Sequence, residues 1–159
     1  MRKINNEDET HFRPVEKSKP VKDLEVLRSW LVESDTFAFQ QQPDGVQLLP
    51  LHLVADWQGL GKRLRIIQAG TCAGSIKHQK FIPDHALALS HRINHEEIQT
   101  ANLSKEQALQ YLRKENVNLT GLSLGYTLMM YSGLALGWAN SLGNRMNNMY
   151  PTQWRIKHL

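Results

Sequence analysis

The stretch Gly133–Arg155, with the sequence GLALGWANSLGNRMNNMYPTQWR, is the most informative part of this chain. It contains three glycines, four asparagines and two arginines, and it contains no acidic residue. Apolar side chains alternate over residues 134–139, and alternation with a period of two predicts a half-buried strand. The second part of the stretch is richer in polar and cationic side chains than a core requires, so it predicts a binding surface.

The residues that precede this stretch supply a partner strand. Apolar residues alternate from Leu122 to Met130, and Ser132-Gly133 is a typical turn pair between two such runs. We therefore predict a β-hairpin over residues 122–139. Trp138 lies on the even-numbered face of the second strand together with Leu134 and Leu136, which assigns its side chain to the core.

The remaining elements are predicted from periodicity, turn residues and helix caps. In chain order they are a helix over 22–34, strands over 36–40, 46–49, 64–67 and 74–77 with a turn at Pro43-Asp44-Gly45, a short helix opened by Pro83, an extended segment over 98–103 and a helix over 105–115. Ser104 and Gln107 form a capping box at the start of the last helix. Many short strands with a few short helices predict an α+β fold, a small mixed β-barrel with flanking helices.

Length and composition indicate one domain in a reducing compartment. We expect residues 21–159 to form the domain and residues 1–20 to be a polar tail that buries little. No apolar run reaches the roughly 18 to 20 residues that a membrane helix needs, and the N-terminus lacks the apolar stretch of a signal peptide. A single cysteine, Cys72, excludes an internal disulfide and favours the cytoplasm.

The net charge of +4 hides an asymmetry between the two parts of the chain. Residues 1–56 carry 7 basic and 10 acidic side chains, whereas residues 57–159 carry 12 basic and 5 acidic ones. Two stretches, 61–83 and 116–159, contain no acid at all. Such a basic half attracts nucleic-acid phosphates over long range, although an ordinary solvated basic face is the alternative interpretation.

Three kinds of side chain in the acid-free stretches suit RNA. Lysine and arginine bind phosphates, asparagine bonds to phosphates and base edges, and tyrosine or tryptophan stacks on unpaired bases. A helix start beside lysines also suits a bound phosphate. The predicted RNA-binding residues are Lys62, Arg63, Lys77, Lys80, His85, Asn140, Asn144, Arg145, Asn148, Tyr150 and Arg155, with Trp154 as a further stacking candidate.

Each of these residues also has a structural interpretation. The asparagines can be turn residues, Tyr150 a core residue and His85 a packing residue at the helix start. Because Arg145 and Asn148 follow the hairpin, we assign them to the RNA face and expect their replacement by alanine to leave stability within about 0.5 kcal/mol. The sequence shows no catalytic set and no metal-ligand set, since no acid or cysteine pattern completes the histidines.

Three motifs in this order carry a resemblance to a known family. They are Phe81-Ile-Pro-Asp-His-Ala-Leu-Ala88, Tyr111-Leu-Arg113, and the stretch 133–155 with its Leu-Gly-Trp and Tyr-Pro pairs. Together they resemble the PUA-like C-terminal RNA-binding domain of RsmF-type (NOL/NOP/Sun family) ribosomal RNA cytosine-5 methyltransferases. The resemblance spans roughly residues 22–156 and is strongest over 70–155. It implies a domain that holds ribosomal RNA while a separate domain methylates a cytosine.

The sequence departs from the family pattern at several positions. Lys114 replaces a glycine, Asn140 replaces a lysine, and residues 147–152 lack lysine and histidine side chains that the family carries. Each lost phosphate contact weakens RNA binding and flattens its salt dependence by about one unit of slope. The family's catalytic domain needs a glycine-rich turn for S-adenosylmethionine and cysteines that attack and release the base. Neither is visible here, so we expect no catalysis and no cofactor.

The leading prediction is a non-catalytic RNA-binding module, either a fragment or a stand-alone relative of these methyltransferases. Its expected partners are RNA, chiefly ribosomal, and a methyltransferase catalytic domain, with no membrane. The rival from another class is a protein-interaction module that docks to a separate methyltransferase or ribosomal component, with an eroded RNA face. The lost lysines favour the rival, and the basic residues 62–80 oppose it. A small-ligand enzyme is disfavoured because no nucleophile, base or metal set is visible.

Overall fold

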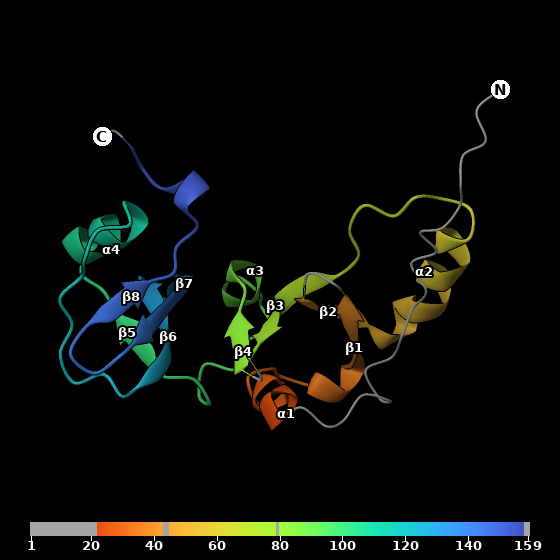
Figure 1. Cartoon of the computed structure of the whole chain (residues 1–159), viewed down its shortest axis with the longest axis horizontal. Helices are drawn as coiled ribbons and strands as arrows, with labels where there is room; N and C mark the ends of the chain where they lie inside the picture. Colours follow the sequence, from red (N-terminus) through yellow and green to blue (C-terminus); the bar gives the residue numbers. More distant parts are fainter. Residues whose placement is uncertain (1–21, 43–44, 79, 158–159) are drawn as a thin grey trace.

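The computed structural model describes residues 22–42, 45–78 and 80–157 (Figure 1). The predicted tail over 1–20 and the first two residues of the Pro43-Asp44-Gly45 turn lie outside the described residues. One sheet contains β1 (Phe37–Gln42), β2 (Gly45–Pro50), β3 (Thr71–Lys77) and β4 (Lys80–Pro83). The other contains β5 (Thr100–Asn102), β6 (Gly125–Tyr131), β7 (Leu134–Ser141) and β8 (Met146–Asn148). The helices are α1 (Lys22–Ser29), α2 (Val54–Gly61), α3 (His85–Ala88) and α4 (Lys105–Leu112).

The two sheets differ in strand direction. The first is an antiparallel meander in chain order, whereas in the second β5 runs parallel to β6 and the other neighbours are antiparallel. The α+β class is therefore confirmed. The predicted barrel is not formed by the strands in the described residues, because their hydrogen bonds leave two separate four-stranded sheets. The chain between β4 and β5 passes through α3 and a long connection, so these two strands become edges of different sheets.

The predicted hairpin is present as β6 and β7, with Leu128 opposite Trp138. Ser132 and Gly133 both have positive φ, 49° and 78°, as a tight two-residue hairpin turn requires. The strand register shifts between Met129 and Met130. Trp138 is buried as expected, at 1% exposure, but Leu134 is 71% exposed. The prediction that Leu134 shares the core face of Trp138 is wrong, because the irregularity interrupts the alternation between the two residues.

The second sheet packs a core on each of its faces. One face shares a hydrophobic core with α1, α3 and the first sheet, and this core contains Leu27, Leu31, Phe39, Val46, Leu48, Ala73, Phe81, Leu87, Leu128, Met130 and Trp138. The opposite face packs against α4 in a second core that contains Ala101, Leu103, Ala108, Tyr111, Val117, Met129 and Ala139. The alternation of Leu128, Met129 and Met130 between the cores is what a strand buried on both faces requires.

The first predicted helix ends at Ser29 rather than at residue 34. Directly after it, Trp30 stacks on Trp138 with ring centroids 5.3 Å apart, and it meets Phe81 and Tyr126 edge-on at 6.1 Å. The other three rings come from β4, β6 and β7, so Trp30 joins the N-terminal part of the chain to the C-terminal hairpin.

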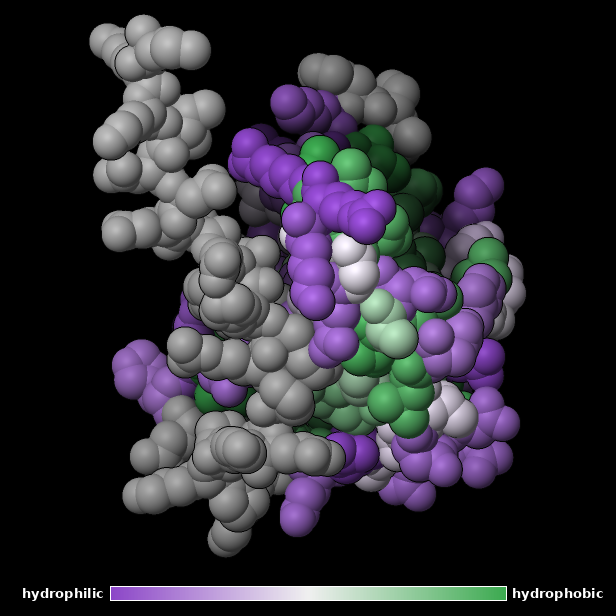
Figure 2. Space-filling model, turned by 90° about the vertical axis from the view of Figure 1, so that its right-hand side faces the viewer, coloured by the Kyte–Doolittle hydropathy of each residue, from purple (hydrophilic) through white to green (hydrophobic). Residues whose placement is uncertain are grey.

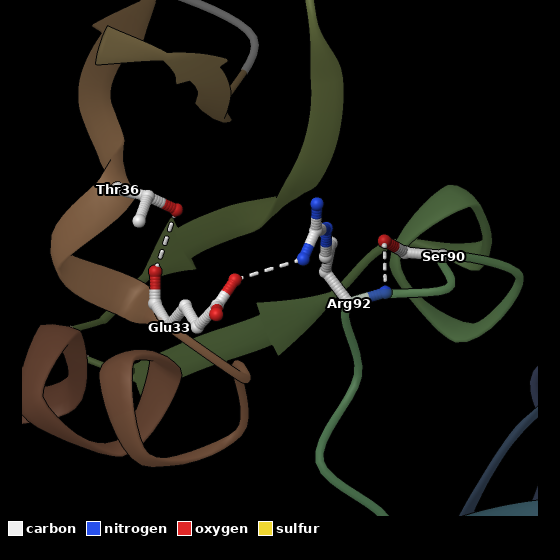
Figure 3. Close-up of polar contacts among 4 residues, drawn as sticks. All are labelled: Glu33, Thr36, Ser90 and Arg92. Carbon is white, nitrogen blue, oxygen red and sulfur yellow. Dashed lines mark hydrogen bonds and ion pairs between the residues drawn. The ribbon is translucent and has the colours of Figure 1, made fainter.

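The connection between the two sheets is tied to the segment that follows α1. Leu31 pairs with Ile93 as an antiparallel bridge, and the carbonyl oxygen of Arg92 accepts a 2.8 Å hydrogen bond from the backbone of Val32. The Arg92 guanidinium lies 2.9 Å from the Glu33 carboxylate, and the Thr36 hydroxyl donates to the Glu33 carbonyl (Figure 3). Because this ion pair is exposed, it contributes at most about 1 kcal/mol, and the backbone pairing carries the connection.

The predicted strand over 64–67 is wrong, and a helix over 54–61 was not predicted. The backbone amide of Leu64 donates to the Leu60 carbonyl as in a helical turn, and Ile67 is 95% exposed. The third strand of the meander is β3, which begins at Thr71. The apolar residues of 64–67 have β propensity but no neighbouring strand to pair with, and propensity alone does not make a strand.

Candidate nucleic-acid interface

The chain after β8 is held against the C-terminal end of α4 by the side chain of Asn148. Its amide nitrogen donates to the carbonyls of Tyr111 at 2.8 Å and Glu115 at 3.3 Å. Its amide oxygen accepts from the backbone of Tyr150 at 2.9 Å. The last carbonyls of a helix lack partners within the helix, and Asn148 supplies partners for carbonyls at this end. The side chain assigned to the RNA face therefore has a structural role that sequence reasoning missed.

Lys114 makes a second attachment. Helix α4 ends at Leu112, earlier than predicted, because Lys114 has a φ of 63° in the left-handed region. Glycine is the usual residue for this conformation, which explains why the related family has a glycine here. The lysine ammonium donates to the Tyr150 carbonyl at 2.7 Å and to the Thr152 hydroxyl at 2.9 Å. A glycine-to-lysine change directly after a helix was the sequence signal that could have indicated this attachment.

The attached segment carries an aromatic cluster that spans both parts of the chain. The His85 ring, from α3, meets Tyr150 at 5.2 Å and Trp154 at 5.1 Å between centroids, both edge to face. Tyr150 in turn meets Tyr111 at 5.6 Å. We call His85, Tyr111, Tyr150 and Trp154 the aromatic cluster. Its inner end is closed, because the buried Tyr111 hydroxyl donates to the Trp138 carbonyl at 2.8 Å. Its outer end, Trp154, is 56% exposed.

Burial favours the neutral form of two rings of the cluster, those of Tyr111 and His85. Desolvation raises the pKa of the Tyr111 phenol, so the hydroxyl remains a hydrogen-bond donor. Desolvation also lowers the pKa of His85, although the neighbouring Asp84 carboxylate opposes the shift. The His85 Nδ1 atom is buried without a hydrogen-bond partner among the described residues. Gly137 leaves the space that this ring needs, since a Cβ there would lie 2.8 Å from Nδ1.

The lowered pKa of His85 predicts a stability that depends on pH. The unfolded chain takes up a proton near the ordinary histidine pKa of about 6.5, whereas the folded state resists protonation until a lower pH. The contribution of the neutral ring is therefore complete above about pH 6.5 and is lost as the pH falls through the folded-state pKa. Thermal unfolding at about pH 7.5 and about pH 5.5 should show a larger loss in the wild type than in His85→Phe, which cannot titrate. Equal losses in the two proteins would contradict the prediction.

The hydrogen bonds of Asn148 make a second testable claim and correct the expectation that its replacement is neutral. Asn148→Ala removes three hydrogen bonds at the end of α4, so we expect it to lower the free energy of unfolding by about 1–3 kcal/mol. Asn147→Ala is the matched control. Asn147 is exposed and adjacent in sequence, so its replacement should change stability by no more than about 0.5 kcal/mol. Urea unfolding of both variants measures the difference, and equal midpoints would contradict the assignment.

The predicted basic residues are exposed but dispersed. Lys62 and Arg63 follow α2, while Lys77 and Lys80 face each other across the β3–β4 hairpin. Arg145 lies in the turn before β8, where its carbonyl accepts from the Leu142 amide at 2.8 Å. Helix α2 and the second sheet lie at opposite ends of the long axis (Figure 1). The basic residues of both ends therefore do not form one compact patch, because the sheets stand side by side along that axis.

The other predicted residues lie on the C-terminal half. Asn140 is half-buried in β7 opposite Asn147, whereas Asn144 is exposed in the turn after β7. Arg155 is exposed directly after Trp154. The structure thus brings His85 into contact with Tyr150, which is hydrogen-bonded to Asn148 and lies five residues before Arg155. Lys62 and Arg63 lie at the other end of the molecule (Figure 1).

The predicted phosphate site at the start of α3 is occupied by the chain itself. Asp84, not Pro83, precedes the helix, and its carboxylate accepts from the Ala86 amide at 2.9 Å. Pro83 is the last residue of β4. A carboxylate at this position both satisfies the free amide and repels an added anion, so His85 serves the aromatic cluster instead.

The described residues contain neither a metal-ligand group nor a membrane-spanning helix. No three histidine, cysteine, aspartate or glutamate residues among them are grouped as a metal ion would need. In the same part of the chain, no helix has the length and apolar character needed to cross a membrane.

Comparison with known families identifies the segment that carries most of this cluster. Residues 99–156 match the family described as the methyltransferase RsmF PUA domain. The match begins directly before β5 and contains α4, the β6–β7 hairpin, β8 and Trp154. No curated protein matched the chain. Over residues 99–156 the chain is therefore similar to the PUA domain of RsmF methyltransferases.

Proposed function

We propose that this chain is a non-catalytic RNA-binding module, and that ribosomal RNA is its ligand. The observation that carries the proposal is the PUA-family match over residues 99–156, because these domains typically bind RNA. The same segment contains no acidic residue from position 116 onward and places Arg145, Trp154 and Arg155 at the surface. Exposed cations of this segment can therefore bind RNA phosphates without repulsion from a carboxylate of residues 116–156.

The proposed RNA contacts keep the residues predicted from the sequence, and the fold divides them by role. Phosphate contacts fall to the exposed cations and to Asn144. His85, Asn148 and Tyr150 position the segment that carries Trp154 and Arg155. The whole proposed set is Lys62, Arg63, Lys77, Lys80, His85, Asn140, Asn144, Arg145, Asn148, Tyr150 and Arg155.

We further propose that residues 21–159 act as one PUA-like domain that requires no cofactor and methylates nothing by itself. The first hydrophobic core supports this, because it joins α1 and the first sheet to the hairpin of the matched segment. The aromatic cluster supports it as well, since His85 comes from outside the match and contacts Tyr150 and Trp154 inside it. The proposed location is the cytoplasm, which suits a chain with one cysteine.

The salt dependence of RNA binding tests the function. Arg145→Ala combined with Arg155→Ala should weaken the binding of ribosomal RNA fragments and reduce the slope of log affinity against log salt by about two, one for each lost phosphate contact. Lys105→Ala is the control, because this exposed lysine lies at the other end of α4 from the attached segment. Fluorescence anisotropy at two salt concentrations measures both quantities. The function is wrong if the wild type shows no saturable binding at low salt.

A second candidate function is a protein-interaction module that docks to a separate methyltransferase or ribosomal component. The observation that favours it is the apolar surface at the α2 end, shown in green among hydrophilic residues in Figure 2. Exposed apolar side chains from this part of the chain are Leu51, Leu53, Leu60, Leu64 and Ile67. Two results together would favour this candidate. The chain would not bind RNA in a titration, and it would bind a purified RsmF-type catalytic domain tightly, with binding abolished by Leu60→Ser.

A further inference from the structure

Trp154 differs from the other three tryptophans in its exposure. Trp138 is 1% exposed, Trp30 and Trp57 are half-buried, and Trp154 is 56% exposed. A large aromatic ring left in water forgoes a substantial hydrophobic gain, of the order of 2 kcal/mol. A single exposed apolar residue is ordinary by itself. The environment of Trp154 is what sets it apart.

The Trp154 ring is held in place although it is exposed. Its backbone amide donates to the Pro151 carbonyl at 3.1 Å within the short helical turn Thr152–Trp154. Lys114 fixes the start of that turn through two hydrogen bonds. The ring itself rests edge to face on His85, at 5.1 Å. An exposed ring with this support loses little conformational freedom when it binds a ligand.

The surroundings of Trp154 match the chemistry of a nucleotide. Arg155 and Lys157 are exposed next to it in sequence, and no acidic residue occurs from 116 to 159. A π-face beside exposed cations binds a base and its phosphates together, which is how proteins commonly hold single strands. A duplex hides the faces of its bases, so this arrangement selects unpaired nucleotides.

We infer that Trp154 is a stacking platform for an unpaired RNA base, with His85 and Tyr150 as the positioning residues behind it. This inference rests on the proposed RNA-binding function and adds the kind of RNA that the site recognises. Tyr150 itself is not the platform, because its ring lies between those of His85 and Tyr111.

The test uses two probes of equal charge and the full chain. One probe is a single-stranded oligouridine of about ten nucleotides, and the other is an abasic ribose-phosphate oligomer of the same length. The proteins are the wild type, Trp154→Ala, Trp154→Phe and the control Leu134→Ala, whose side chain is also exposed on the matched segment. Affinity is measured at two salt concentrations, and tryptophan emission is recorded during each titration. Circular dichroism shows that each variant is folded.

We expect Trp154→Ala to lose affinity only for the probe that carries bases. Trp154→Ala should bind oligouridine about tenfold more weakly than the wild type, with an unchanged salt slope and unchanged affinity for the abasic oligomer. Trp154→Phe should retain most of the affinity, and Leu134→Ala should retain all of it. Oligouridine should quench the emission of the wild type more than that of Trp154→Phe, and the abasic oligomer should quench neither.

Three contrary results separate the two proposals. If the wild type binds oligouridine and Trp154→Ala binds it equally well, the stacking platform is wrong while the RNA-binding function stands. The same conclusion follows if the wild type binds both probes equally, and Trp154 would then be a contact for another surface, such as a protein. If the wild type binds neither probe at low salt and no ribosomal RNA fragment, the proposed function fails and this inference fails with it.

Discussion

Trp138→Ala is expected to lower the free energy of unfolding by about 3–5 kcal/mol, the range for truncating a buried aromatic residue. Its ring is 1% exposed and stacks on Trp30 at 5.3 Å. The indole nitrogen also donates to the Asp84 carbonyl at 2.9 Å, which ties β7 to the start of α3. The substitution therefore opens a cavity between the two sheets and leaves a carbonyl without its partner.

Thermal and urea unfolding of Trp138→Ala measure this loss, and Leu134→Ala provides the control on the same strand. Leu134 is 71% exposed, so its truncation should change stability by no more than about 0.5 kcal/mol. A Trp138→Ala protein as stable as the control would mean that the main core does not depend on the contact between β7, α1 and α3.

Gly137→Ala is expected to cost about as much as the loss of Trp138, although it adds only one methyl group. The new Cβ would lie 2.6 Å from the Tyr111 hydroxyl oxygen and 2.8 Å from two atoms of the His85 ring. Gly137 also has a φ of 144°, which side chains rarely adopt. Backbone strain of about 1–3 kcal/mol and overpacking of about 1–3 kcal/mol should add to a loss of roughly 3–5 kcal/mol.

Gly125→Ala separates the two contributions. Gly125 begins the paired strand β6 with a φ of 114°, and a Cβ there would meet nothing within 4 Å. Gly125→Ala should therefore show the backbone strain alone, and its loss of unfolding free energy should be clearly smaller than that of Gly137→Ala. In the His85→Ala background, Gly137→Ala should cost less than in the wild type, because one of the two crowded side chains is gone. Additive losses in that double variant would contradict the close contact between Gly137 and His85.

Features that depend on neighbouring residues could be predicted from the sequence. The Ser104–Gln107 capping box is present as predicted, with both reciprocal hydrogen bonds, because its geometry involves only four consecutive residues. The β6–β7 hairpin was predictable because alternating side chains and a Ser-Gly turn specify it locally. The errors over 54–67 have the same origin, since nothing local shows that residues 64–67 have no strand beside them.

The candidate site was predictable in composition but not in roles. From the sequence alone it follows that residues 116–159 carry cations, asparagines and aromatic rings without acids. The alternation along β7 assigned Trp138 to the core correctly, but it wrongly placed Leu134 there as well. Only the tertiary structure decided that His85 meets Trp154, that Asn148 holds the end of α4, and that α2 lies far from the second sheet. The chemistry of the side chains and the spacing at which apolar residues recur are local properties of the chain. Which distant side chains meet depends on strand register, on a single irregularity in the hairpin and on how the two sheets pack, and all three are set by the whole core.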